Sequence, residues 1–217
     1  MIPLRDTIPT SRVPLVNYAL IVANVAVFLY AVSLGRDAEG FIMAHGLVPR
    51  AFTFSTLLTS MFLHGGLLHL VGNMLYLYIF GDNIEDRLGS VRYILFYLLC
   101  GIAAGAAQAI ANPDSTLPMV GASGAVAGVL GAYLLFFPRA RVVTLVPIFF
   151  FLRIVEIPAV VLLVIWFAWQ LLSGIATLGD RAGMGGVAFF AHVGGFLAGM
   201  VLGPLLQRRR HVAPRWG

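Results

Sequence analysis

Long apolar runs separated by short polar segments dominate this chain. The first run covers residues 15–34, and later runs cover residues 64–80, 91–111, 121–137, 154–177 and 187–206. A helix needs roughly 20 predominantly apolar residues to cross the hydrocarbon core of a bilayer, and the runs approach that length. The pattern predicts an all-α, polytopic membrane protein. We expect a bundle of six transmembrane helices with both termini on one side of the membrane.

Composition and charge support this class and argue against others. Of the 217 residues, 60% are hydrophobic and 11% are charged, far from the average of soluble domains. The net charge of +5 comes from basic residues scattered between apolar runs, which argues against a nucleic-acid partner. Cys100 is the only cysteine, so neither an intrachain disulfide nor a cysteine-rich metal site is available.

The runs divide the chain into three parts. Residues 1–14 are expected to form a short extended lead, residues 15–206 a single membrane domain, and residues 207–217 a basic tail. The lead and the first run do not look like a signal peptide. A small-residue cleavage site should end such a run, whereas here Gly35, Arg36 and Asp37 follow it.

The placement of arginine predicts the orientation in the membrane. The chain has 14 basic residues, all of them arginine. All but Arg36, Arg50 and Arg181 lie before the first run, after the last run, or in the second and fourth connections. The positive-inside rule therefore puts both termini in the cytoplasm, and we expect a multi-pass protein of a bacterial cell membrane. The long, largely apolar connection after the first run then lies outside, partly in the membrane interface.

A polar cluster opens the second run, in the sequence H-G-G-L-L-H-L-V-G-N. His69 and Asn73 are four residues apart, so on a helix they share one face and can point at one place. His64 falls roughly 140° away around an ideal helix and is assigned to the preceding turn. Hydrogen bonding between helices is the alternative role for this pair. A metal site is not expected, because no H-E-x-x-H motif is present.

The segment G-D-N-I-E-D-R-L-G, residues 81–89, follows the second run. It is interpreted as a structural turn, in which Gly81 and Gly89 suit the backbone. Glu85, Asp86 and Arg87 can cap helix ends or pair with a neighbouring loop.

The fourth run begins with G-A-S-G, which puts Ser123 at or near the N-terminus of a helix. The first N–H groups of a helix lack helical partners and carry partial positive charge, so they favour an oxyanion. The neighbouring Gly121, Ala122 and Gly124 leave room for a substrate carbonyl beside the hydroxyl. Close helix packing is the alternative explanation of this motif.

The sixth run places His192 at the head of a glycine stripe. Gly195, Gly199 and Gly203 follow it by three, seven and eleven residues, near one helical face. A second small-residue surface lies in the fourth run, at Gly124, Gly128 and Gly131. If the two surfaces pack together, His192 meets Ser123 as a base beside a nucleophile. The alternative is an isolated histidine bound to a backbone carbonyl.

No acid is placed to complete a triad. All nine carboxylates lie in connections or at the edges of runs, so a serine–histidine dyad is the available arrangement. The fifth run contains Trp166, Trp169 and Gln170 and is interpreted as a lipid-facing wall or gate.

In this order the motifs resemble those of the rhomboid intramembrane serine proteases. The resemblance covers runs two to six and rests on H-G-G-L-L-H-L-V-G-N, the E-D-R-x-G turn, G-A-S-G and A-H-V-G-G-F. It implies a six-helix bundle with a water-filled cavity open to the outer face. It also implies Ser123 as nucleophile, His192 as general base, and an oxyanion hole formed by His69, Asn73 and the Ser123 backbone N–H.

Two features depart from well-known bacterial members. Some members place a tyrosine on the catalytic histidine four residues after the serine, where this chain has Ala127, so another group must hold His192. The outer loop also lacks the Trp-Arg pair seen in some members.

These observations predict an intramembrane serine endopeptidase that cleaves transmembrane segments of membrane proteins near the outer face. No metal or organic cofactor is expected, and the partners are membrane lipid and helical substrates with small or helix-weakening residues. A catalytically silent rhomboid-like protein that binds membrane clients is the alternative. A small transporter is disfavoured, because the polar groups cluster toward one face and no repeat is visible.

Overall fold

The computed structural model describes residues 1–148, 151–177 and 187–208, and most of these residues are helical. The α-helices are α1 (Leu15–Ser33), α2 (Ala38–His45), α3 (Phe54–Thr59), α4 (Leu67–Leu88), α5 (Ser90–Ala111), α6 (Ser123–Phe136), α7 (Ala159–Ala176) and α8 (Phe189–Leu206). Short 3-10 helices lie at Gly35–Asp37, Pro49–Ala51 and Ser60–Phe62, and the strands are β1 (Ile2–Asp6), β2 (Arg141–Ile148) and β3 (Phe151–Pro158). A helical protein was therefore predicted correctly.

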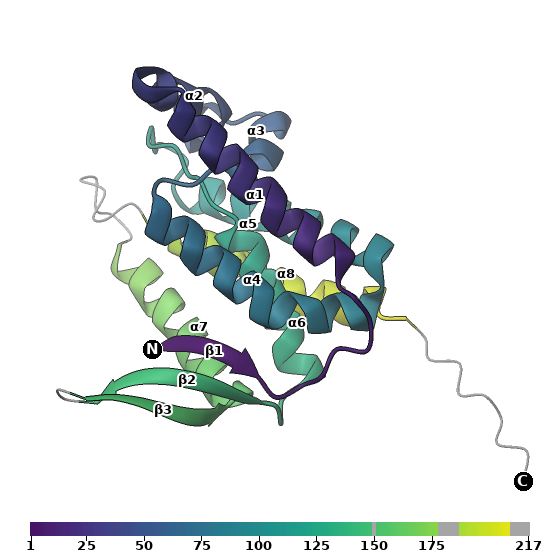
Figure 1. Ribbon diagram of the computed structural model, residues 1–217. Coiled ribbons are helices and arrows are strands. Elements are labelled where there is room, and N and C mark those ends of the chain that lie inside the picture. The colour runs from purple at the N-terminus through teal and green to yellow at the C-terminus, as the bar shows by residue number, and fades with distance from the viewer. Residues whose placement is uncertain (149–150, 178–186, 209–217) are drawn as a thin grey trace, which may run out of the picture.

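Helix α6 forms the centre of the bundle. Its residues from Gly124 to Tyr133 are all buried. Figure 1 shows α1 and α4 on the near side, α6 and α8 behind them, and a small sheet below, from which α7 rises. The two central helices approach closely because glycine faces glycine: a Cβ on Gly199 would collide with the backbone of Gly128. The small-residue surfaces named from the sequence thus lie against each other.

Length and composition mark several of these helices as able to cross a membrane. Four of them, α1, α5, α7 and α8, meet both requirements. The segment Phe54–Phe62 together with α4 meets them as one bent pair with an angle of 90°, and α6 is a shorter apolar helix of 14 residues. These helices correspond in order to the six predicted runs, with changes in their boundaries.

The largest departure from the predicted elements is a three-stranded antiparallel sheet. The lead was expected to be extended and no strand was predicted in the fourth connection, but β1 pairs with β2, and β2 pairs with β3. The register joins Ile2 to Leu145 and Arg141 to Pro158. The predicted fifth run began at residue 154 because β3 is also apolar. The helix begins only after Pro158, the last residue of β3, whose fixed φ and missing N–H suit the start of a helix.

The segment 81–89 is also more helical than predicted. Helix α4 continues through Gly81 to Leu88, and the turn is confined to Gly89, whose φ of 78° favours glycine. Glu85 accepts hydrogen bonds from the backbone N–H groups of Val16 and Asn17, at 3.2 and 2.8 Å. These N–H groups open α1, so Glu85 caps a helix end as its position in the sequence suggested.

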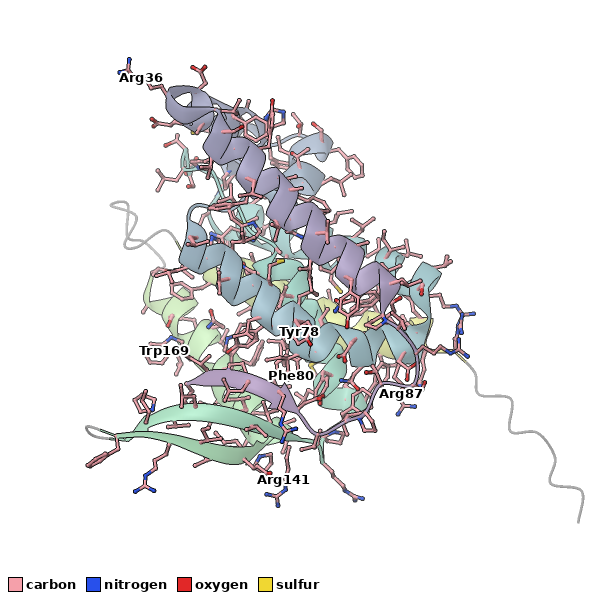
Figure 2. The ribbon with its side chains drawn as sticks, viewed as in Figure 1. Arg36, Tyr78, Phe80, Arg87, Arg141 and Trp169 are labelled. Carbon is pink, nitrogen blue, oxygen red and sulfur yellow. The ribbon has the colours of Figure 1, made fainter. Side chains whose placement is uncertain are left out.

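The arginines of the described residues lie toward different ends of the molecule. Arg36 and Arg141 mark the top and the bottom of the view in Figure 2. The sequence assigned these two arginines to opposite sides of a membrane. Arg181 and the tail residues from 209 onward, which also entered the orientation argument, lie outside the described residues.

Candidate active site

Ser123 and His192 meet where α6 and α8 begin. Ser123 is the first residue of α6 and His192 the fourth residue of α8. The Ser123 Oγ lies 2.8 Å from the His192 Nε2, a hydrogen-bond distance between a hydroxyl and a ring nitrogen. Both side chains are half-buried. The pair has the geometry of a nucleophile and a base that can accept its proton.

The close approach of the two helices brings this pair together. A Cβ on Gly195 would collide with the carbonyl of Gly124, and a Cβ on Gly124 would collide with Ala104 of α5. Helices separated by larger side chains would carry Ser123 and His192 apart. The site therefore depends on glycine at these positions.

Helix α4 contributes His69 on the other side of Ser123. A Cβ on Gly121 would lie 2.8 Å from Cε1 and 2.9 Å from Nε2 of the His69 ring, and 3.5 Å from Ser123 Oγ. His69 Nε2 and Ser123 Oγ thus border one small space, which the missing side chain of Gly121 leaves open. The φ of 132° at Gly121 also favours glycine, and its N–H donates to the Ser60 carbonyl at 2.9 Å.

Asn73 lies one turn after His69 on the same helix. Its side chain is 7% exposed, and its Nδ2 donates to the His69 carbonyl at 2.9 Å. An asparagine amide carries two N–H groups, so one remains for another acceptor. His64 lies in the turn before α4, as its spacing suggested, and its ring packs on His69 with centroids 5.2 Å apart.

The N-terminus of α6 supplies backbone donors. The first helical hydrogen bond runs from the Val126 N–H to the Ala122 carbonyl, at 2.9 Å. The N–H groups of Ser123, Gly124 and Ala125 precede it and have no helical acceptor. A small cavity beside them is lined by Ser60, Ser123, Gly124 and Ala191, among others.

Helix α7 holds the far side of the His192 ring. The Gln170 Oε1 lies 2.7 Å from His192 Nδ1, and the Trp166 ring packs on the imidazole with centroids 5.8 Å apart and a tilt of 38°. From the sequence, both side chains were assigned to a lipid-facing wall or gate. Their spacing of four residues, which puts them on one helical face, was the available signal. In the described part of the chain, no group of three or more His, Cys, Asp or Glu side chains is arranged to hold a metal ion.

Together the fold and this site define a multi-pass helical membrane protein with a serine–histidine pair between two glycine-rich helices. The Rhomboid domain family model matches residues 51–209, well over half of the chain. The chain therefore belongs to the rhomboid family.

Relatives come from plants, bacteria and yeast. The chain is 33% identical over 158 residues to RHOMBOID-like protein 6, mitochondrial, of Arabidopsis thaliana, covering 69% of this chain and 43% of the relative. It is 33% identical over 147 residues to Rhomboid protease GluP of Bacillus subtilis, covering 68% and 26%. Against Rhomboid protein 1, mitochondrial, of Saccharomyces cerevisiae it is 29% identical over 214 residues, covering 92% and 58%. The chain thus spans only part of the length of each of these relatives.

Proposed function

We propose that this chain is a serine endopeptidase that hydrolyses peptide bonds within transmembrane segments. The observation that carries the proposal is the 2.8 Å contact between Ser123 Oγ and His192 Nε2 at adjoining helix starts. Membership of a family that includes a named protease, GluP, supports the same class of reaction.

The proposed reaction proceeds by acylation and deacylation of Ser123. His192 Nε2 takes the hydroxyl proton as Ser123 Oγ bonds to the scissile carbonyl carbon, and the carbonyl electron pair moves to oxygen. The carbon–nitrogen bond then breaks, and the proton on Nε2 passes to the leaving amine. Water attacks the acyl group with His192 as base, which releases the second product and restores Ser123.

In this proposal three kinds of donor stabilise the oxyanion. They are His69, the remaining N–H of Asn73 and the free backbone N–H groups at the start of α6. Hydrogen-bond donors that are fixed before the reaction stabilise the developing charge without reorganisation. This arrangement favours acyl transfer over a role in which Ser123 only packs.

The proposed substrates are transmembrane helices with small or helix-weakening residues near the outer face. A helical backbone is hydrogen-bonded to itself, so the scissile segment must unwind before the serine can attack it. We place both termini on the cytoplasmic side, following the distribution of arginine, and the Ser123 site toward the outer face. Replacement of the small residues of a cleaved segment by leucine should slow cleavage strongly, as measured in liposomes.

The decisive experiment requires no knowledge of the natural substrate. Detergent-purified protein is treated with a fluorophosphonate probe, and the adduct is located by mass spectrometry. Labelling at Ser123 is expected in the wild type and in Ser60→Ala, a matched control that removes a different serine from the same cavity. Ser123→Ala and His192→Ala should not be labelled.

The opposite outcome favours the second candidate. If folded wild-type protein is not labelled and does not cleave a transmembrane substrate in liposomes, the chain acts as a rhomboid-like protein that binds membrane clients. A flux of solute in the same liposomes would instead indicate transport.

A further inference from the structure

Helix α7 contains a buried glutamine that the dyad mechanism does not use. Gln170 is 8% exposed, whereas its neighbours Trp169 and Leu172 are 66% and 65% exposed. The helix is otherwise apolar, apart from Ser173 near its end. A buried amide in a transmembrane helix is costly unless it is hydrogen-bonded, and Gln170 meets His192.

The contact is made to the ring nitrogen that the serine does not use. Gln170 Oε1 lies 2.7 Å from His192 Nδ1, while Nε2 lies 2.8 Å from Ser123 Oγ. An amide oxygen only accepts hydrogen bonds, so this contact requires a proton on Nδ1. The neutral imidazole then has its lone pair on Nε2, facing the serine hydroxyl, which is the tautomer that a general base needs.

The reverse arrangement would disable the base. If the Gln170 amide presented its NH2 group to Nδ1, the proton would move to Nε2 and the ring could not accept the hydrogen of Ser123. The orientation of one amide thus selects between a competent and an incompetent tautomer.

Trp166 adds a steric restraint from the same helix. It lies one turn before Gln170, and its ring packs both on His192 and on Phe196, with a centroid distance of 6.1 Å to the latter. Phe167 stacks on Phe196 at 4.7 Å. Ala127, which has no ring to offer His192, is fully buried inside the bundle. The aromatic packing on the imidazole therefore comes from α7, while the contact from α6 is the one with Ser123 Oγ.

We propose that Gln170 is a positioning residue that, together with Trp166, holds His192 in the tautomer and orientation that activate Ser123. The proposal rests on the proposed peptidase function, because it assigns Gln170 a part in the acylation of Ser123. Gln170 acts only through His192 and does not touch the substrate.

The test measures acylation and the tautomer separately. Gln170→Met keeps the length of the side chain and removes the acceptor, whereas Gln170→Glu keeps an acceptor oxygen. Gln108→Met is the matched control. Gln108 Oε1 accepts from the backbone N–H of Ala191 in α8 at 3.2 Å, so its bond lies next to His192 in sequence but does not involve the ring.

For each purified protein, fluorophosphonate labelling gives the maximal acylation rate and the probe affinity. The 15N NMR spectrum of histidine-labelled protein gives the tautomer, with His192→Ala identifying the signal among five histidines.

In the wild type the proton should reside on Nδ1. Gln170→Met should lower the maximal acylation rate by about 10- to 100-fold and leave the probe affinity unchanged. This loss does not exceed the factor of about 10²–10⁴ that a general base contributes, because the base itself remains. Its spectrum should show protonation spread over both ring nitrogens. Gln170→Glu should recover most of the rate, and Gln108→Met should keep the wild-type tautomer.

Two results would overturn the role of Gln170. One is a wild-type His192 with its proton on Nε2, a measurement for which His192→Ala serves only to identify the signal. The other is wild-type acylation by Gln170→Met. A wild type that is not labelled at all would instead reject the peptidase function on which the proposal rests.

Discussion

The two ends of helix α4 carry polar clusters that differ in how their hydrogen bonds are completed. At its start, His69 and Asn73 join Ser123 and His192 to form the Ser123 cluster. At its end, Glu85 joins Asn17, Ser90 and Tyr93 to form the Glu85 cluster. Both clusters lie in an apolar bundle, where an unpaired polar group is costly.

The Glu85 cluster leaves little unpaired. Glu85 accepts from Ser90 Oγ at 2.6 Å in addition to the N-terminus of α1. Asn17 donates to the Leu77 carbonyl at 3.0 Å and accepts from Tyr93 at 2.7 Å. In the Ser123 cluster, one N–H of Asn73 has no acceptor within the described part of the chain, and the first N–H groups of α6 have no helical acceptor. A closed cluster stabilises the fold, whereas an open one holds donors ready for an incoming group.

The largest effect is predicted for a substitution that prevents the close approach of α6 and α8, on which the Ser123 cluster depends. Gly199→Val should abolish folding, because its Cβ would collide with the backbone of Gly128, which no rotamer change can relieve. We expect a loss of about 4–5 kcal/mol or more in the free energy of unfolding. Gly72→Val is the matched control, since a Cβ on Gly72 meets nothing within 4 Å. Thermal unfolding in detergent measures both, and a folded Gly199→Val would show that the helices can separate without cost.

Asn73→Ala should affect the reaction and spare the fold. Among the described residues, its side chain binds the carbonyl of its own helix four residues back and no other group, so its loss costs little stability. The rate of acylation should fall by about 10²–10³-fold if Asn73 donates to the oxyanion. Cleavage of a transmembrane substrate and thermal unfolding are measured on the same preparation. Wild-type turnover would remove Asn73 from the site.

Asn17→Ala should lower the stability of the fold and spare the reaction. Asn17 and Asn73 therefore form a matched pair. Asn17 is fully buried, and its loss leaves the Tyr93 hydroxyl without its acceptor and the Leu77 carbonyl without its side-chain donor. We expect the free energy of unfolding to fall by about 2–3 kcal/mol. The acylation rate of the folded fraction should stay within about twofold of the wild type, because the cluster lies at the far end of α4. A selective loss of rate would mean that the two ends are coupled.

The sequence predicted the helices and the meeting of α6 with α8 because both depend on local patterns. A long apolar run indicates a helix in a membrane, and glycines at helical spacing indicate a close contact. Ser123 and His192 head such stripes, and in the structure their side chains lie in contact. The sheet depended on pairing between the N-terminus and a segment more than a hundred residues later, so no local pattern indicated it. Strand β3 was also apolar enough to merge with the helix that follows.

Gln170 was missed for a different reason. Helix α7 is apolar around nearly its whole circumference, so the sequence does not show which face meets α8. Only the packed structure shows that Gln170 faces His192 and that Trp169 faces away, on the exposed side of α7 in Figure 2. The absence of a ring at Ala127 indicated that some group must hold His192 but not which helix supplies it.

The smallest effect predicted concerns a polar contact between the sheet and the bundle. Asp6 of β1 accepts hydrogen bonds from the Tyr133 hydroxyl and from Asn83 Nδ2, the latter at 2.9 Å. Burial raises the pKa of Asp6 above its ordinary value of 3.8, and the bond from Tyr133 opposes that rise. A carboxyl whose folded pKa is raised favours the folded state when protonated, so its contribution to stability declines as pH rises from about 4 through the folded pKa.

Tyr133→Phe removes a bond that is stronger to the carboxylate than to the neutral acid. The variant should therefore lose about 1–2 kcal/mol at pH 7 and clearly less near pH 4, as measured by thermal unfolding at both pH values. Equal losses at the two pH values would show that the hydroxyl contributes through packing and not through the charge of Asp6.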